Sequence, residues 1–99
     1  MSWRSMLAAG RRENVIRRVA IIDLGSNSWR LVVFTYSRDG EGAWWKRTDE
    51  LYETVRIGAG LGATGILSEE AIARGLETLT VFNGFCRAAG LKREDVHPI

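Results

Sequence analysis

The residues most suited to chemistry lie in one short turn between two apolar runs. Asp23 follows the first run, and the small residues Gly25, Ser26, Asn27 and Ser28 come just after it. Successive backbone N–H groups in such a turn can form a concave anion site. A carboxylate beside a bound phosphate is useful when Mg²⁺ bridges the two, because Mg²⁺ prefers oxygen ligands. The order of these residues predicts a phosphate-binding hairpin in which Asp23 contacts the metal.

A simpler explanation of the same turn stays open. Gly-Ser-Asn turns between strands are common, and an aspartate can cap such a turn through its side chain. Both interpretations need a strand on either side of the turn. Residues 19–22 and 31–36 are rich in β-branched and aromatic side chains, which is typical of strands with buried faces.

A third strand is predicted after a polar, glycine-rich turn at residues 37–42, and it extends from about residue 43 towards residue 51. Trp44 and Trp45 are adjacent in it, so their side chains point to opposite faces. We expect one ring to pack inward and the other to be exposed or to meet a partner domain. Stacking of nucleic-acid bases on the pair is the alternative.

One long helix is predicted over residues 68–89. Ser68 suits the N-cap position, and Gly90 suits the residue that ends a helix. Apolar residues at spacings of three and four predict a single buried face made of Ile72, Leu76, Leu79, Phe82 and Cys86. A close approach of this helix to the sheet would explain Gly75 and Gly84. Cys86 is interpreted as a core residue rather than a nucleophile.

Composition limits what the chain can be. Its 99 residues make one domain at most, and a chain of this size buries a modest core. No apolar run approaches the roughly 20 residues of a membrane span. The single cysteine excludes an internal disulfide and is consistent with a reducing, cytoplasmic location. His97 has no cluster of other metal-binding residues around it in the sequence, so a metal site there is not expected.

The first 18 residues differ from the rest of the chain. They carry five arginines and one glutamate, a balance of +4. We expect residues 1–18 to form a disordered basic arm, and residues 19–99 to form the folded part. A basic arm can also bind nucleic acid or another polyanion by counterion release, and this alternative stays open.

Two segments together resemble a known family. Residues 23–31, Asp-Leu-Gly-Ser-Asn-Ser-Trp-Arg-Leu, are similar to the first phosphate motif of the exopolyphosphatase and guanosine pentaphosphate phosphohydrolase family, which belongs to the actin, sugar kinase and Hsp70 superfamily. Residues 54–61, Thr-Val-Arg-Ile-Gly-Ala-Gly-Leu, with residues 64–65, 67–72 and 74–76, resemble a second family segment. Trp29 stands where the family more often has Phe, and Ala59 stands where it often has an acidic residue.

The resemblance implies a fold. We expect a mixed α/β, ribonuclease H-like (actin-like ATPase) domain, of which this chain holds only the first part. Three strands should form an antiparallel meander, followed by the long helix. A fourth strand should begin near residue 96 and join the sheet beside the first strand through a crossover.

The resemblance also implies Mg²⁺-dependent hydrolysis of a terminal phosphoanhydride in polyphosphate or guanosine pentaphosphate. Gly25, Ser26, Asn27 and Ser28 would bind phosphate, together with Arg56, whose guanidinium can donate a forked pair of hydrogen bonds. No catalytic residue is expected among the 99, because the family's catalytic glutamate would lie beyond Ile99. The chain is therefore interpreted as an inactive N-terminal fragment that needs its missing C-terminal domains. A homodimer is conceivable, because dimers occur among relatives.

Two other classes of function stay open. One is a non-catalytic module that senses phosphate or a nucleotide, since the superfamily includes regulatory proteins. The other is a polyanion or nucleic-acid binder that uses the arginine-rich arm.

Overall fold

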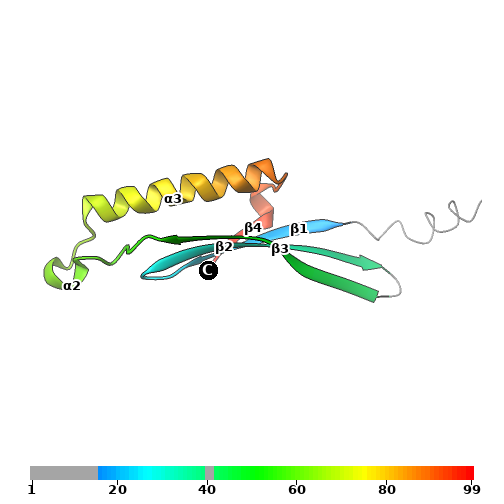
Figure 1. The fold of residues 1–99 in the computed structure, drawn as a ribbon, viewed down its shortest axis with the longest axis horizontal. Coiled ribbons are helices and arrows are strands. Elements are labelled where there is room, and N and C mark those ends of the chain that lie inside the picture. Colours follow the sequence, from blue (N-terminus) through cyan, green and yellow to red (C-terminus); the bar gives the residue numbers. More distant parts are fainter. Residues whose placement is uncertain (1–15, 40–41) are drawn as a thin grey trace, which may run out of the picture.

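The computed structural model describes residues 16–39 and 42–99, in which four strands form one sheet. The strands are β1 (Arg17–Leu24), β2 (Ser28–Asp39), β3 (Gly42–Thr54) and β4 (Val96–Pro98), and their order in the sheet is β3-β2-β1-β4 (Figure 1). β1, β2 and β3 pair antiparallel in sequence, and β4 pairs parallel to β1. The predicted meander and the crossover to a fourth strand beside the first are both confirmed.

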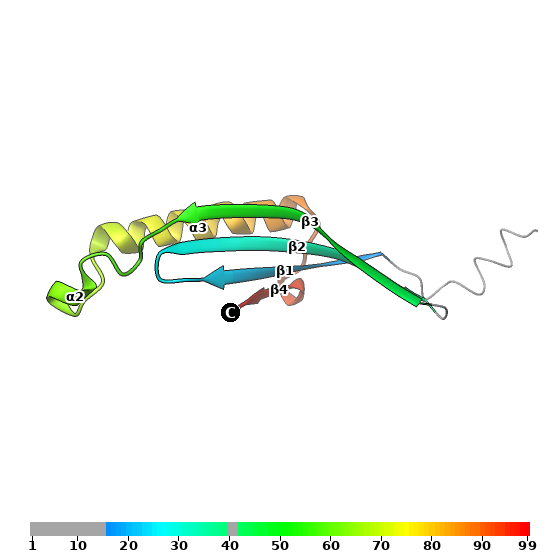
Figure 2. The ribbon, with the colours of Figure 1, turned by 60° about the horizontal axis from the view of Figure 1, so that its bottom comes forward.

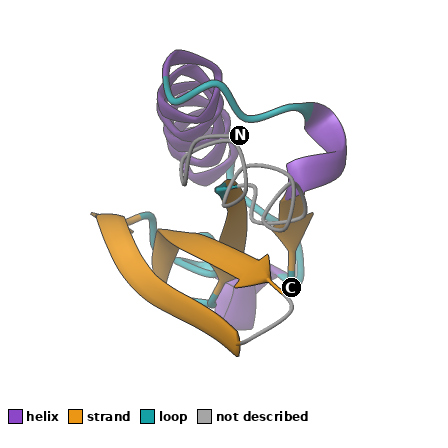
Figure 3. Ribbon diagram, turned by 90° about the vertical axis from the view of Figure 1, so that its right-hand side faces the viewer, coloured by secondary structure: helices purple, strands orange, loops and turns teal. Residues whose placement is uncertain are grey.

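One long helix covers one face of this sheet. It is α3 (Glu69–Ala88), which follows the one-turn helix α2 (Leu61–Thr64) and precedes the 3₁₀ helix η1 (Arg93–Asp95). Figure 2 shows α3 running along the strands, and Figure 3 shows it end-on, on one side of the sheet. α3 therefore makes the crossover that brings the chain from β3 to β4. No helix in the described part of the chain is long and apolar enough to cross a membrane.

Several predicted boundaries need correction. β1 begins at Arg17, so the last two residues of the expected basic arm belong to the sheet, where Arg17 lies opposite Tyr36. Residues 1–15 of that arm lie outside the described residues. β3 continues to Thr54, beyond the predicted end near residue 51. Residues 58–65, which include four glycines, contain α2, with Gly60 and Gly65 in left-handed conformation at its two ends.

Both ends of α3 form as predicted. The Ser68 hydroxyl accepts a hydrogen bond from the backbone N–H of Ala71 (3.1 Å), which satisfies one of the free donors of the first turn. At the other end the Leu91 N–H donates to the Cys86 carbonyl, and the Gly90 N–H donates to the Arg87 carbonyl. This pair of bonds is the Schellman motif, and it requires the positive φ of 79° that Gly90 adopts.

The buried face of α3 is not the predicted one. Phe82 and Cys86 are buried as expected, whereas Ile72, Leu76 and Leu79 are exposed. The face against the sheet consists of Ala71, Gly75, Thr78, Phe82 and Cys86. The predicted and the observed faces share Phe82 and Cys86 and differ by one position over residues 71–79. Both have helical spacing, and the sequence pattern favoured the predicted face because it is more apolar. At Gly75 a small residue is needed because the Trp29 and Ile57 side chains fill the space there.

The helix approaches the sheet closely at Gly75. A Cβ atom on this residue would lie 3.0 Å from the Trp29 ring and 3.3 Å from Cδ1 of Ile57. Gly84 has no such neighbour within 4 Å, so the prediction that close approach explains both glycines is wrong for Gly84.

The two glycines make a matched pair for stability measurements. Gly75→Leu is expected to lower the free energy of unfolding by about 1–3 kcal/mol, because Trp29 is buried and cannot move aside without strain. Gly84→Leu is expected to raise it by roughly 0.5–1 kcal/mol through helix propensity. Urea denaturation followed by circular dichroism measures both. Equal effects of the two substitutions would contradict the packing at Gly75.

The paired tryptophans do not behave as predicted. Trp44 is 44% exposed and Trp45 is 70% exposed, so neither ring packs into the core. Trp45 instead makes an edge-to-face contact with Phe34, with 5.7 Å between the ring centroids. The core lies under α3, where Leu31 and Val33 of β2 meet Phe82.

Candidate functional site

The predicted phosphate-binding residues occupy the turn between β1 and β2. Gly25 allows the chain to close, because a Cβ atom there would lie 2.7 Å from the Ser28 carbonyl oxygen. The Trp29 indole Nε1 donates a hydrogen bond to the Gly25 carbonyl (2.9 Å). The tryptophan therefore does more than the ring packing that the sequence analysis considered, since phenylalanine has no group that could donate this bond.

The turn is tied to the end of β3. The carbonyl of Asn27 accepts hydrogen bonds from the backbone N–H groups of Val55 (3.0 Å) and Arg56 (2.8 Å). The structure thus brings Arg56 beside the turn, although the whole hairpin of β2 and β3 separates them in the sequence. The Arg56 side chain is exposed at this point.

Arg56 has a backbone conformation that side chains rarely adopt. Its φ angle is 50°, in the left-handed region, and a non-glycine residue stays there only when its surroundings hold it. Arg74 of α3 supplies part of that hold. Its Nε donates to the Val55 carbonyl (2.8 Å) and its Nη2 donates to the Arg56 carbonyl (3.2 Å). The N–H of Ala59 also donates to the Arg56 carbonyl (3.0 Å).

Arg74 is a residue of this site that the sequence pattern did not single out. Its only signal was its place in residues 74–76, which resemble the family segment. Arg74 acts through the backbone of Arg56, so it is a positioning residue that ties α3 to the loop beside the hairpin.

Arg74→Met is expected to lower the free energy of unfolding by about 1–2 kcal/mol, because two carbonyls lose their charged donor. The backbone amide resonance of Arg56 should shift as its conformation relaxes. Arg87→Met serves as the control, since Arg87 is an exposed arginine of the same helix. Urea denaturation and amide spectra provide the two readouts. Similar losses in both variants would contradict the role of Arg74.

The turn between β1 and β2 offers free backbone donors to an anion. Among the described residues, no hydrogen bond is formed by the backbone N–H groups of Ser26 and Asn27, and both residues are exposed. The Ser28 hydroxyl shares a hydrogen bond with the Tyr52 hydroxyl (2.7 Å). These two free amides, and Arg56, whose backbone is bonded to the same turn, are the candidate donors of an anion site.

Asp23 lies in β1, one residue before its end, opposite Arg30 of β2. Its side chain is exposed, so a carboxylate oxygen is open to a cation. The described residues contain no group of three or more His, Cys, Asp or Glu side chains that could hold a metal ion. A Mg²⁺ ion bound by Asp23 would therefore have one protein carboxylate as ligand and would take its other ligands from phosphate oxygens and water.

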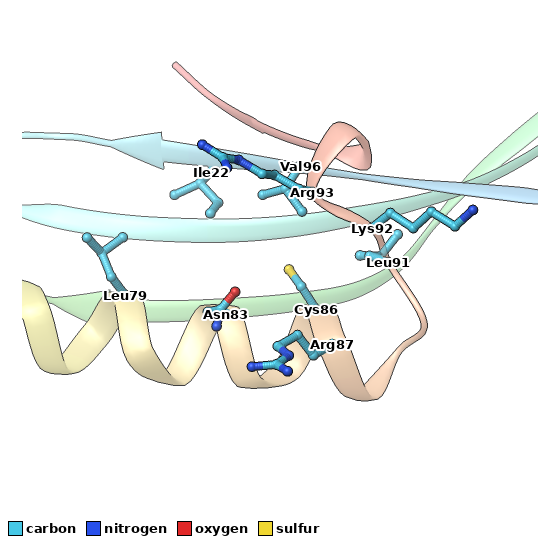
Figure 4. Close-up of a pocket in the computed structure, with 9 residues that line it drawn as sticks. All are labelled: Ile22, Leu79, Asn83, Cys86, Arg87, Leu91, Lys92, Arg93 and Val96. Carbon is cyan, nitrogen blue, oxygen red and sulfur yellow. The ribbon is translucent and has the colours of Figure 1, made fainter.

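A groove of about 590 Å³ lies between α3 and the β1–β4 side of the sheet (Figure 4). None of the predicted site residues lines it, so it is separate from the hairpin. Cys86 borders this groove and belongs to the core, as predicted. Burial raises the pKa of the Cys86 thiol, which keeps it protonated and unreactive at neutral pH.

Comparisons with known proteins point to one family, although no family model matches the chain. The chain is 35% identical to a putative exopolyphosphatase of Haemophilus influenzae, over 96% of this chain and 27% of that protein. Its fold matches solved structures of the Aquifex aeolicus Ppx/GppA protein. One has a TM-score of 0.73 at 27% identity and another a TM-score of 0.70 at 28% identity; each match covers 85% of this chain and 26% of that one.

An exopolyphosphatase from Cytophaga hutchinsonii has the same fold, with a TM-score of 0.64 at 24% identity. The chain spans about a quarter of the length of the proteins that it matches. Over that quarter, sequence and fold confirm the predicted resemblance to the Ppx/GppA family of exopolyphosphatases.

Proposed function

We propose that this chain supplies the phosphate-binding side of a Mg²⁺-dependent hydrolase. The hydrolase would remove the terminal phosphate of linear polyphosphate or guanosine pentaphosphate. The chain would act as part of a longer protein, in keeping with relatives about four times its length. The remaining domains would supply the catalytic base, and the 99 residues alone would bind phosphate without hydrolysing it.

One observation carries this proposal: the hydrogen bonds that tie Asn27 to Arg56. They hold the backbone of Arg56 against the turn that carries the two free amides, and its left-handed φ angle supports a firmly held backbone from which the guanidinium would reach a bound phosphate. In the proposed site these amides and the guanidinium orient the phosphate. A Mg²⁺ ion bound by Asp23 would neutralise charge on the phosphate oxygens. Neither Glu69 nor Glu70 is assigned as a base, because both lie in the first turn of α3 and interact with its dipole.

The proposal is tested by titrating the ¹⁵N-labelled chain with short-chain polyphosphate in the presence of Mg²⁺. Amide shifts are expected to concentrate at residues 25–28 and 56. Arg56→Met is expected to weaken binding about tenfold, the loss of one charged hydrogen-bonding group. Arg93→Met is the control, because this exposed arginine of η1 borders the groove, which none of the predicted site residues lines (Figure 4).

Asp23→Asn is expected to remove the Mg²⁺ dependence of binding while retaining binding in the absence of the metal. Equal weakening by the Arg56 and Arg93 substitutions would refute a specific site and indicate general attraction of an anion to a basic protein. Phosphate release by the 99-residue chain would refute the part of the proposal that assigns the catalytic base to other domains.

A further inference from the structure

The end of β2 and the start of β3 extend beyond α3, away from the turn between β1 and β2 (Figure 1). Three aromatic rings lie there on the sheet face that α3 does not cover. They form what we call the aromatic platform: Phe34, Tyr36 and Trp45. Side chains alternate along a strand, and Leu31 and Val33 face α3, so Phe34 and Tyr36 face away from it. Trp45 lies opposite Tyr36 in the register and touches the Phe34 ring, which places it on the same face.

The platform is solvent-accessible. Trp45 is 70% exposed, Tyr36 is also exposed and Phe34 is half-buried. A tryptophan exposed in this way leaves apolar ring surface in contact with water. A planar ligand stacked on the ring would bury that surface.

Arginines surround the platform on three strands. We call them the arginine rim: Arg17, Arg38 and Arg47. Arg17 lies opposite Tyr36, and Arg47 lies opposite Phe34. Arg38 lies two residues after Tyr36, so it shares the same face. The carboxylate of Glu50 is already shared by Arg47 (3.4 Å) and Arg30 (3.6 Å).

We propose that the aromatic platform and its arginine rim bind single-stranded nucleic acid. The rings offer flat surfaces on which unpaired bases stack, and the guanidinium groups pair with the phosphates between them. A double helix does not fit this chemistry, because its bases are already stacked on one another. Polyphosphate does not explain the rings, because it has no base to stack. The surface is therefore distinct from the phosphate hairpin, which lies at the other end of β2.

The test measures binding of a fluorescent 12-nucleotide oligouridylate to the full chain by anisotropy. Trp45→Ala is expected to weaken binding about tenfold, which is the effect of losing one stacked base. Trp44→Ala is the matched control, because Trp44 is the adjacent residue on the opposite face, and it should change binding less than twofold. Replacing Arg17 and Arg38 together with glutamine should reduce the slope of log Kd against log salt by about 1.4, or about 0.7 for each lost phosphate contact.

Four results would overturn the proposal. Equal effects of the Trp44 and Trp45 substitutions would mean that no ring face is recognised. If polyphosphate displaced the labelled oligonucleotide as effectively as unlabelled oligouridylate does, charge alone would account for the binding. If deletion of residues 1–15 abolished binding while the Trp45→Ala variant bound normally, binding would be assigned to the N-terminal residues. A dimer that Trp45→Ala dissociates, without oligonucleotide binding, would make this face a contact between two copies. Circular dichroism confirms that each variant is folded.

Discussion

Phe82→Ala is expected to lower the free energy of unfolding by about 3–5 kcal/mol, enough to unfold much of the chain at room temperature. Phe82 has no exposed surface, and it packs against Leu31 and Val33, which are also fully buried. Removing its ring leaves a cavity that rigid strands cannot fill. Thermal and urea denaturation measure the loss.

Leu76→Ala in the same helix provides the control. Leu76 is 60% exposed, so its substitution should change stability by less than about 0.5 kcal/mol. The two substitutions distinguish the observed buried face of α3 from the predicted one, because the sequence pattern placed both Leu76 and Phe82 on the buried face. A large loss at Leu76 and a small one at Phe82 would mean that α3 is rotated about its axis, with Leu76 and not Phe82 against the sheet.

Gly25→Val is expected to affect both stability and phosphate binding. Its Cβ would lie 2.7 Å from the Ser28 carbonyl oxygen, and this neighbour is backbone that cannot rotate aside. The turn must open, at a cost of about 1–3 kcal/mol, and the bond between the Trp29 indole and the Gly25 carbonyl is lost. Because the amides of Ser26 and Asn27 move with the turn, polyphosphate binding should weaken at least tenfold.

Gly42→Val tests whether this effect is specific. Gly42 begins β3 in the other hairpin, and a Cβ atom there would meet nothing within 4 Å. Valine is also favoured in strands, so stability and polyphosphate binding should stay near those of the original chain. Denaturation and the amide titration measure both variants. Retained polyphosphate binding in Gly25→Val would show that the turn does not hold the anion.

Local patterns in the sequence determined much of the fold. Ser68 and Gly90 specified the ends of α3, because capping depends on residues within one turn of each end. The strands on either side of the hairpin followed from β-branched runs whose register a tight turn sets. The crossover of β4 to the side of β1 came from the family resemblance rather than from periodicity.

The tertiary structure alone decided how these elements meet. Which stripe of α3 is buried depends on the shape of the sheet beneath it, and Trp29 leaves room only for Gly75. The same holds for the site: Arg56 reaches the turn through the Asn27 carbonyl, and Arg74 holds it there from another element. Hydrogen bonds between residues this far apart leave no periodic trace in the sequence. The sequence therefore identified the residues that we propose to bind phosphate, and only the fold brought Arg56 to the turn.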